Sequence, residues 1–356
     1  MNINSFILAF FVSMVVNFLI IKYFDHIFHD PVKGGTQKFH TKPTPRAGGL
    51  GIFIGVLTAG IVIYFKNPAL VLDYYKILGA SLFTFLAGIM EDITKKVSVK
   101  QRFLFMGFSA VVSVFLCGAI INRVDIPWLD NLFSIYPFAF IFTIFAIVGL
   151  TNAINIIDGF NGLASGVSIM ILLAIGYVAY KNNDLLVMIF SIVIIGSILG
   201  FFVFNYPSGL VFLGDGGAYF IGFMIGILSI LLVKNNPQVS PWFAVLVSIY
   251  PIYETLFSIY RKKFLRKVSP TEPDGLHLHM LFYKTVAKKL LGTINPIYRN
   301  PATSPLIWIL NTFGTIPAVL FWDNTQVLIF FSFVFAIVYT YIYFSIIKSK
   351  LPKQNN

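Results

Sequence analysis

Long apolar runs are the feature that most constrains how this chain folds. A helix needs about 20 predominantly apolar residues to cross the hydrocarbon core of a bilayer, which is roughly 30 Å thick, and runs close to that length recur along the whole sequence. Charged residues make up only 11% of the chain, against about 25% in an average soluble domain. The sequence therefore predicts an all-α polytopic membrane protein with about 11 transmembrane helices. The helices are expected near 3–24, 47–65, 77–90, 103–121, 132–154, 163–180, 185–206, 218–233, 240–260, 304–322 and 326–347.

The connections between the runs predict one antiparallel bundle. The link at 181–184 is so short that the helices on either side must form a hairpin, so successive loops alternate between the two sides of the membrane. The first run has no basic residue before it and is too long for the apolar core of a signal peptide, so we expect it to remain as a helix. A single bundle over residues 1–347, followed by a polar tail at 348–356, is the expected organisation.

Basic residues are distributed unequally between the two sides. If the N-terminus lies outside, the inner segments hold 21 lysine and arginine residues and the outer loops hold 5. Because lysine and arginine favour the cytoplasmic side, we expect the N-terminus outside and the C-terminus in the cytoplasm. The formal net charge of +12 is then mainly a topology signal, and nucleic-acid binding is not expected. For the basic stretch at 261–267, contact with anionic lipid headgroups is an equally good interpretation.

Composition excludes cysteine chemistry. The only cysteine, Cys117, lies in an apolar run, and one cysteine can form neither an internal disulfide nor a thiolate metal cluster.

The polar residues that topology does not explain fall in five clusters on the expected inner side. The inner loops that carry the expected chemistry are 25–46, 91–102, 151–162, 205–217 and 261–303.

The first two clusters each allow a functional and a structural interpretation. Residues 40–49 combine prolines, which stiffen the backbone, with two glycines that let a helix begin close to a ligand. A phosphate bound near Lys42 and a rigid helix entry are both compatible with that pattern.

Glu91 and Asp92, the second cluster, are adjacent acids at a helix end. Two neighbouring carboxylates repel each other, so the pair is costly near a membrane. A bound cation, a role as catalytic base, or ion pairs with the nearby lysines would each account for it.

The next two clusters are more specific. Polar residues recur at every third position between 151 and 162, which places at least the first three near one face of a helix, where burial without a partner is costly. They are Asn152, Asn155, Asp158 and Asn161. Asp215 stands among glycines just before an apolar run, where backbone N–H groups can approach a phosphate and the carboxylate suits a hard cation such as Mg²⁺. A tight turn explains the glycines but not an acid that has no cationic partner among its sequence neighbours.

The fifth cluster contains a His-x-His pair, His277 and His279, in the only long inner loop. Two imidazoles without a cysteine do not make a closed zinc site, so diphosphate binding ranks ahead of a metal site and of a plain amphipathic loop helix. One further acid, Glu254, lies within an apolar run about two turns before Arg261 and is expected to pair with a basic residue.

Taken in order, the five clusters resemble the polyprenyl-phosphate N-acetylhexosamine-1-phosphate transferases, which form part of glycosyltransferase family 4. The family includes the enzyme that makes the first lipid intermediate of peptidoglycan and those that initiate O-antigen (lipopolysaccharide), enterobacterial common antigen and teichoic acid synthesis. The family's Asn-x-x-Asn-x-x-Asp-Gly segment is matched from Asn152 to Gly159, and its Gly-Asp loop by Gly214 and Asp215.

Three positions depart from the family pattern. Glu91 replaces the usual first aspartate of an Asp-Asp pair, Asn161 replaces an aspartate that is common there, and Met280 replaces a third histidine. The extra methylene of Glu91 shifts its carboxylate, which leaves Asp92 as the better candidate for a base, an orienting group or a nucleophile. The loop at 275–280 resembles members that start surface polysaccharides more than the peptidoglycan enzyme.

The resemblance implies a Mg²⁺-dependent phosphotransfer, with Mn²⁺ as an alternative ion. N-acetylhexosamine-1-phosphate would pass from UDP-N-acetylhexosamine to undecaprenyl phosphate at the cytoplasmic face of a bacterial inner membrane, and UMP would leave. It also implies Mg²⁺ at Asp215 and Asn155, catalytic roles for Asp92, Glu91 and Asp158, and substrate contacts at Lys42, Lys100, Asn152, Asn161, His277 and His279.

A secondary transporter is the main alternative, because many helices with buried polar groups suit alternating access. Transporters place such groups near the bilayer midplane between repeats, whereas here they are expected on one side, and no internal repeat is visible. Beyond the two substrates, membrane lipids are the expected partners. The sequence leaves open which N-acetylhexosamine is used, which polymer follows, and whether the protein forms a homo-oligomer.

Overall fold

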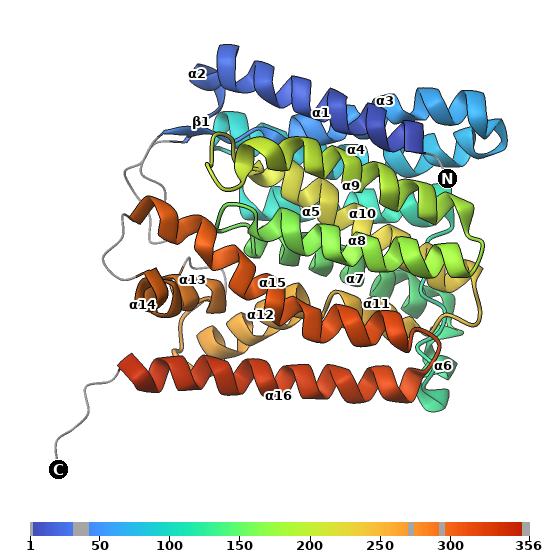
Figure 1. Cartoon of the computed structure of the whole chain (residues 1–356). Coiled ribbons are helices and arrows are strands. Elements are labelled where there is room, and N and C mark those ends of the chain that lie inside the picture. The colour runs from blue at the N-terminus through green and yellow to red at the C-terminus, as the bar shows by residue number, and fades with distance from the viewer. Residues whose placement is uncertain (1–2, 31–42, 270–273, 292–295, 351–356) are drawn as a thin grey trace.

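The computed structural model describes residues 3–30, 43–269, 274–291 and 296–350, and these residues are mostly helical (Figure 1). The only strands in the described part are β1 (His29–Asp30) and β2 (Thr44–Pro45), which pair antiparallel. The long helices are α1 (Ile3–Tyr23), α3 (Gly48–Lys66), α4 (Val71–Thr94), α5 (Val99–Cys117), α7 (Tyr136–Ile156), α8 (Leu163–Lys181), α9 (Leu185–Asn205), α10 (Gly214–Asn235), α15 (Pro296–Leu320) and α16 (Thr325–Lys350). The predicted all-α membrane fold is confirmed.

The predicted eleven runs correspond to ten continuous helices and one broken span among the described residues. Ten helices among the described residues are long and apolar enough to cross a membrane. The run predicted at 240–260 is instead α11 (Pro241–Val247) followed by α12 (Ile249–Tyr260), and the two segments meet at 73°. Pro251 has no N–H to donate to the carbonyl of Val247, so the helix ladder is interrupted at this point.

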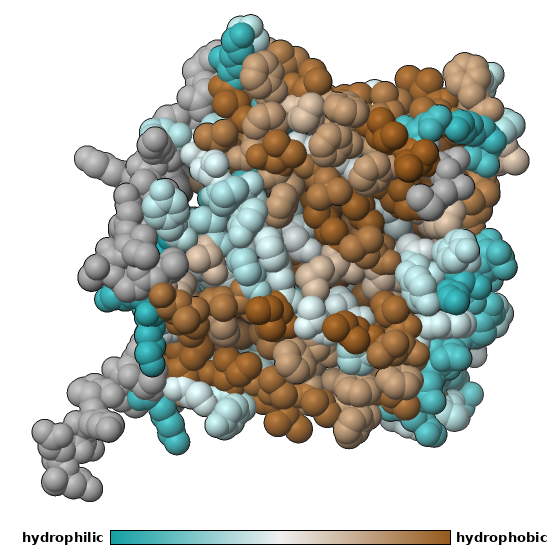
Figure 2. Space-filling model, viewed as in Figure 1, coloured by the Kyte–Doolittle hydropathy of each residue, from teal (hydrophilic) through white to brown (hydrophobic). Residues whose placement is uncertain are grey.

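Helix α10 lies at the centre of the bundle. Every residue of its most apolar window is buried, and it packs against α3, α4, α7 and α8. Helices α1 and α16 lie at the periphery, where 28% of the corresponding windows is buried. On the face seen in Figure 2, hydrophobic residues cover most of the middle of the bundle and hydrophilic residues gather mainly toward its ends. This distribution is the one expected of a protein whose sides contact lipid.

The polar clusters of the sequence meet at one end of the bundle. The N-terminal ends of α3, α5, α8 and α10 and the C-terminal ends of α4, α7, α9 and α12 lie at the left of Figure 1, next to the short helices α13 (Leu278–Phe282) and α14 (Lys288–Leu291). Helix α16 continues to Lys350, three residues into the predicted polar tail, and residues 351–356 lie outside the described part.

Candidate active site

Asp215, in the first turn of α10, is the centre of a charged cluster. Its Oδ1 accepts hydrogen bonds from Nη2 of Arg46 at 2.8 Å and from Nδ2 of Asn155 at 3.2 Å, and its Oδ2 accepts one from Nη1 of Arg102 at 2.8 Å. The residue is 6% exposed. The expectation that Asp215 has no cationic partner holds for its sequence neighbours, but two arginines reach it from 169 and 113 positions away.

Arg46 is held in place by backbone pairing between two distant segments. Its N–H donates to the carbonyl of Phe28 at 2.8 Å, and it forms a parallel bridge with Phe212. The N–H groups of Gly48 and Gly49 donate to the carbonyls of Phe212 and Leu213 at 2.9 Å. The start of α3 is therefore tied to the segment that leads into α10, and Arg46 projects toward Asp215 from that junction.

Arg102 reaches the site because of how α5 begins. Ser98 and Gln101 form a capping box, in which the Ser98 side chain accepts from the Gln101 N–H and the Gln101 side chain accepts from the Ser98 N–H. This cap fixes the first turn so that Arg102 faces Asp215, while the predicted phosphate contact Lys100 is exposed. Lys42, the other predicted basic contact, lies outside the described residues.

Asp92 holds the beginning of α10. Its Oδ1 and Oδ2 accept the backbone N–H groups of Asp215 and Gly216, each at 2.9 Å, and the residue is only 1% exposed. A carboxylate at a helix N-terminus satisfies unpaired N–H groups and complements the helix dipole. Gly214 has a φ of +76°, and a Cβ there would lie 2.5 Å from Asp92 Oδ2, so the turn requires a glycine.

Glu91, the neighbour of Asp92, makes a different contact. Its Oε2 accepts the backbone N–H of Val97 at 2.9 Å, which closes the turn between α4 and α5. Asp92 also lies 3.7 Å from Nε of Arg46, so this arginine bridges the two aspartates Asp92 and Asp215. The two acids predicted as a pair therefore face different partners.

The predicted asparagine stripe is only partly helical. Helix α7 ends at Ile156, so Asn152 and Asn155 lie on it and Asp158 follows it in the turn. Burial raises the pKa of Asp158 to about 7; the charge of Arg46 lowers it and that of Asp215 raises it. These mutual effects place Asp158 in the same charged cluster as Asp215.

Asn161, the last member of the stripe, links three segments. Its backbone N–H donates to Oδ1 of Asn300 at 2.9 Å, its Nδ2 donates to the carbonyl of Pro207 at 3.0 Å, and its carbonyl accepts from Ser304 Oγ at 2.6 Å. These bonds hold the turn before α8 against α15 and the loop after α9. Asn161 thus has protein partners on both its backbone and its side chain.

The histidine pair is buried rather than exposed on a loop. His277 and His279 are 4% and 0% exposed, and their rings stack at 5.4 Å with an interplanar angle of 8°. Nε2 of His279 has no hydrogen-bond partner among the described residues, and a Cβ on Gly159 would lie 3.2 Å from it. Burial lowers the pKa of His279 to about 3 despite the charge of Glu254, so this ring is neutral at physiological pH. The pair therefore adjoins the turn that follows Asp158.

Glu254 does contact a basic side chain, but that side chain is His277 and not Arg261. Its Oε1 accepts from Nδ1 of His277 at 2.9 Å and from the N–H of Leu278 at 3.2 Å, and its Oε2 accepts from the hydroxyl of Tyr339 at 2.8 Å. Arg261 instead pairs with Asp274 at 2.8 Å. A carboxylate that is 0% exposed needs several donors, and the histidine segment and α16 supply them.

Comparison with known proteins identifies the family of this chain. The family model described as glycosyl transferase family 4 matches residues 74–233. A protein of Bacillus subtilis (strain 168), named probable undecaprenyl-phosphate N-acetylglucosaminyl 1-phosphate transferase, is 34% identical over 248 residues, which are 68% of this chain and 66% of that protein. The chain belongs to glycosyl transferase family 4.

Other relatives share a different name. A phospho-N-acetylmuramoyl-pentapeptide-transferase of Bacillus subtilis is 29% identical over 239 residues, covering 64% of this chain and 74% of that protein. One of Lactobacillus johnsonii is 25% identical over 347 residues, covering 90% and 97%. The family predicted from the five clusters is confirmed, and the chain is an enzyme of this transferase family.

In this family 4 glycosyl transferase, the matched region extends from α4 into α10 and contains Asp92, Arg102, Asn155, Asp158 and Asp215. The histidine pair and the arginine before α3 lie outside the match and are brought to the same end of the bundle by the fold. Sequence reasoning did not single out either arginine of the cluster. The capping box of Ser98 and Gln101 is a local signal for the start of α5, whereas the direction of Arg102 toward Asp215 follows from tertiary packing.

Proposed function

We propose that this enzyme transfers N-acetylhexosamine-1-phosphate from a UDP-sugar to undecaprenyl phosphate, giving undecaprenyl-diphosphate-sugar and UMP, and so initiates a cell-surface polysaccharide. The observation that carries the proposal is the cluster in which Asp215 lies between two arginines beside Asn155, Asp92 and Asp158. Guanidinium groups bind phosphate oxygens in a bidentate manner. The 34% identical relative is named for the N-acetylglucosaminyl reaction, which favours an N-acetylhexosamine donor.

Two side chains at this end carry oxygens of the type that binds magnesium: the Asp215 carboxylate, which in this structure accepts from Arg46 and Arg102, and the Asn155 amide. Carboxylate and amide oxygens are the donors that Mg²⁺ prefers, and in proteins Mg²⁺ is commonly held by one or two carboxylates together with substrate phosphates. The described residues contain no group of three or more acidic, histidine or cysteine side chains poised for a metal, so substrate oxygens are needed to complete the coordination. Asp215 and Asn155 would hold the ion, and Mn²⁺ is expected to substitute for it. When bound, the ion offsets the negative charge of the diphosphate.

The other residues bind and orient the reactants. Arg46 approaches Asp215 from the segment before α3 and Arg102 from α5, and we assign both to phosphate oxygens of the nucleotide sugar when it is bound. The lipid phosphate is largely dianionic at neutral pH, because its second pKa is about 6. Its oxygen forms a bond to the sugar-bearing phosphorus while the bond between that phosphorus and the oxygen of UMP breaks. No protein base is required for this step, and we assign Asp92 to holding the first turn of α10.

The location of the cluster favours a cytoplasmic site. The cluster lies at the bundle end that carries α13 and α14, and the positive-inside count assigns this end to the cytoplasm. A water-soluble UDP-sugar reaches a site at a bundle end directly, and a polyprenyl phosphate presents its headgroup at the same depth. An alternating-access transporter would have its polar groups at the bilayer midplane, so the transporter interpretation is disfavoured.

The experiment is a transfer assay on detergent-purified protein with undecaprenyl phosphate and radiolabelled UDP-sugars. UDP-GlcNAc, UDP-GalNAc and UDP-N-acetylmuramoyl-pentapeptide are compared, with and without EDTA. We expect labelled lipid and released UMP with an N-acetylhexosamine donor, and loss of both with EDTA. Preference for the muramoyl-pentapeptide donor would overturn the polysaccharide assignment, and absence of product with every donor would overturn the transferase proposal.

A further inference from the structure

A buried hydrogen-bond network connects the last helix of the chain to the histidine pair. Glu254 on α12 is its centre, and it accepts from His277, from the N–H of Leu278 and from Tyr339 on α16. Glu254 and Tyr339 are both 0% exposed. Neither lysine nor arginine takes part in the three hydrogen bonds to this carboxylate, and its nearest donors along the chain, His277 and Tyr339, are 23 and 85 positions away.

The network determines which ring nitrogen of His277 carries a proton. A carboxylate only accepts hydrogen bonds, so Nδ1 of His277, which lies 2.9 Å from Glu254 Oε1, must be the donor. The Leu278 N–H bond to the same oxygen fixes the backbone next to the ring. Residues that bond one nitrogen of a histidine set its tautomer and its orientation. Glu254 therefore holds Nδ1 of His277 as a donor and orients the ring, whose other nitrogen, Nε2, lies 3.7 Å from Oδ1 of Asp274.

The orientation of the His279 ring depends on that of His277, because the two rings pack against each other. The two rings stack nearly parallel, and the His279 ring also contacts Phe160 with centroids 5.8 Å apart. Nδ1 of His279 lies 3.4 Å from the hydroxyl of Tyr250. If that hydroxyl donates, Nε2 bears the proton and presents a buried N–H toward Gly159. A rotation of His277 would displace this N–H from the turn that follows Asp158.

We infer that Glu254 and Tyr339 are positioning residues: they orient His277, and through it the Nε2 of His279, at the transfer site. The hydrogen bonds of Glu254 and Tyr339 join them to each other and to the histidine segment, so they act through the histidine pair. The inference rests on the proposed function. If Tyr339 has this role, α16 contributes to the rate of transfer as well as covering the lipid-facing side of the bundle.

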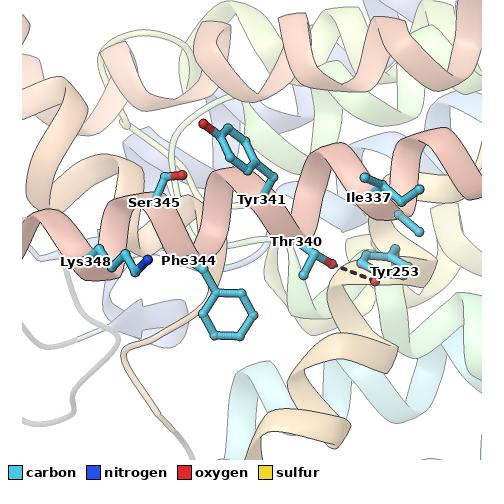
Figure 3. A pocket seen from close by; sticks show the side chains of 8 residues that line it. Tyr253, Ile337, Thr340, Tyr341, Phe344, Ser345 and Lys348 are labelled. Carbon is cyan, nitrogen blue, oxygen red and sulfur yellow. Dashed lines mark hydrogen bonds between the residues drawn. The ribbon is translucent and has the colours of Figure 1, made fainter.

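The chain offers a matched control for this inference. The hydroxyl of Tyr253 on α12 forms a hydrogen bond of 2.9 Å with Oγ1 of Thr340 on α16 (Figure 3). This bond joins the same two helices as the Tyr339–Glu254 bond, but it borders an outward groove of about 490 Å³ lined by residues such as Tyr341 and Phe344. Removing either hydroxyl loses one bond between α12 and α16, and only one of the two bonds involves Glu254.

The first experiment compares Tyr339→Phe with Tyr253→Phe in the transfer assay and in thermal unfolding. We expect melting temperatures that agree within a few degrees, a loss of about tenfold in kcat for Tyr339→Phe, and kcat within twofold of wild type for Tyr253→Phe. Glu254→Gln, which keeps the volume, should lose at least as much turnover as Tyr339→Phe. Equal turnover of the two tyrosine variants would overturn the inference, because helix packing alone would then explain the bond.

A second measurement does not depend on transfer activity. The chain has five histidines, so ¹⁵N labelling of histidine gives a small set of ring signals, and His277→Gln assigns one of them. We expect that signal to report a protonated Nδ1 in wild type and in Tyr253→Phe, and to change in Glu254→Gln. An unchanged signal in Glu254→Gln would overturn the positioning role. If the signal changes in Glu254→Gln but the wild-type protein transfers no sugar phosphate from any donor, Glu254 still orients His277 and the proposed function is wrong.

Discussion

Replacing Asp92 with asparagine separates a positioning role from a chemical one. Both carboxylate oxygens of Asp92 accept backbone N–H groups at the start of α10, at 2.9 Å, and the side chain is buried. Asparagine has one oxygen and one NH₂ group, so one of the two N–H groups, from Asp215 or Gly216, would face another donor. The substitution is nearly isosteric, so its effect comes from the hydrogen bonds and the charge.

The magnitude follows from those two bonds. A buried N–H without an acceptor costs about 1–3 kcal/mol, and the remaining bond loses roughly 1 kcal/mol when its acceptor becomes neutral. The sum is about 2–4 kcal/mol, which is a large part of a typical unfolding free energy of about 5–15 kcal/mol. We expect Asp92→Asn to fold, to unfold more easily, and to lose about 10- to 100-fold in turnover, because the first turn of α10 also carries Asp215.

The assay measures unfolding in mixed micelles with SDS and turnover on the same purified variant. A general base contributes roughly 10²- to 10⁴-fold to rate, and its removal need not alter stability. An Asp92→Asn protein with wild-type stability and a rate reduced by four orders of magnitude would therefore refute the positioning argument and restore Asp92 as a base. Asp92→Glu is a useful companion, because the longer side chain keeps the charge but displaces the acceptor from the α10 amide groups.

Three further predictions concern the metal, the topology and the histidine pair. Asp215→Asn should lose roughly a thousandfold in turnover, with only partial recovery at high Mg²⁺. A metal stabilises the transition state by several kcal/mol, and each factor of ten in rate corresponds to about 1.4 kcal/mol. A folded variant that keeps a tenth of its activity would exclude Asp215 as the metal ligand. In a Cys117→Ala background, a cysteine that replaces the exposed Lys181 should react with a membrane-impermeant maleimide added to intact cells, and one that replaces the exposed Lys100 should not. The opposite pattern would show that the predicted orientation in the membrane is reversed. His279→Ala should raise the KM for the UDP-sugar or lower kcat, whereas a change confined to the KM for undecaprenyl phosphate would reverse the substrate assignment.

The spans were predictable because their cause is local. A backbone in lipid must satisfy its own hydrogen bonds, so each crossing needs its own apolar helix, which the sequence displays directly. The break at 73° between α11 and α12 was not predicted, although Pro251 is visible in the sequence. A proline weakens a helix, but the neighbouring helices decide whether it bends there.

The chemistry-bearing residues were partly predictable for a related reason. Asp215, Asp158 and Asn155 stand out because polar side chains are costly in an apolar run, and the structure brings these three together. The histidines were expected on a soluble loop, yet they are buried, because Glu254 and Tyr250 supply partners that a loop sequence does not reveal.

By itself the sequence determined the number of apolar spans, the gathering of polar residues at one end of the bundle, and the family. Only the tertiary structure decided the partners: Arg46 and Arg102 for Asp215, the amide groups of α10 for Asp92, and Tyr339 for Glu254. The physical reason is one of range. The need for apolar helices acts on every residue within its own segment, whereas a buried charge is stabilised by whichever donors the packing of distant helices brings within about 3 Å.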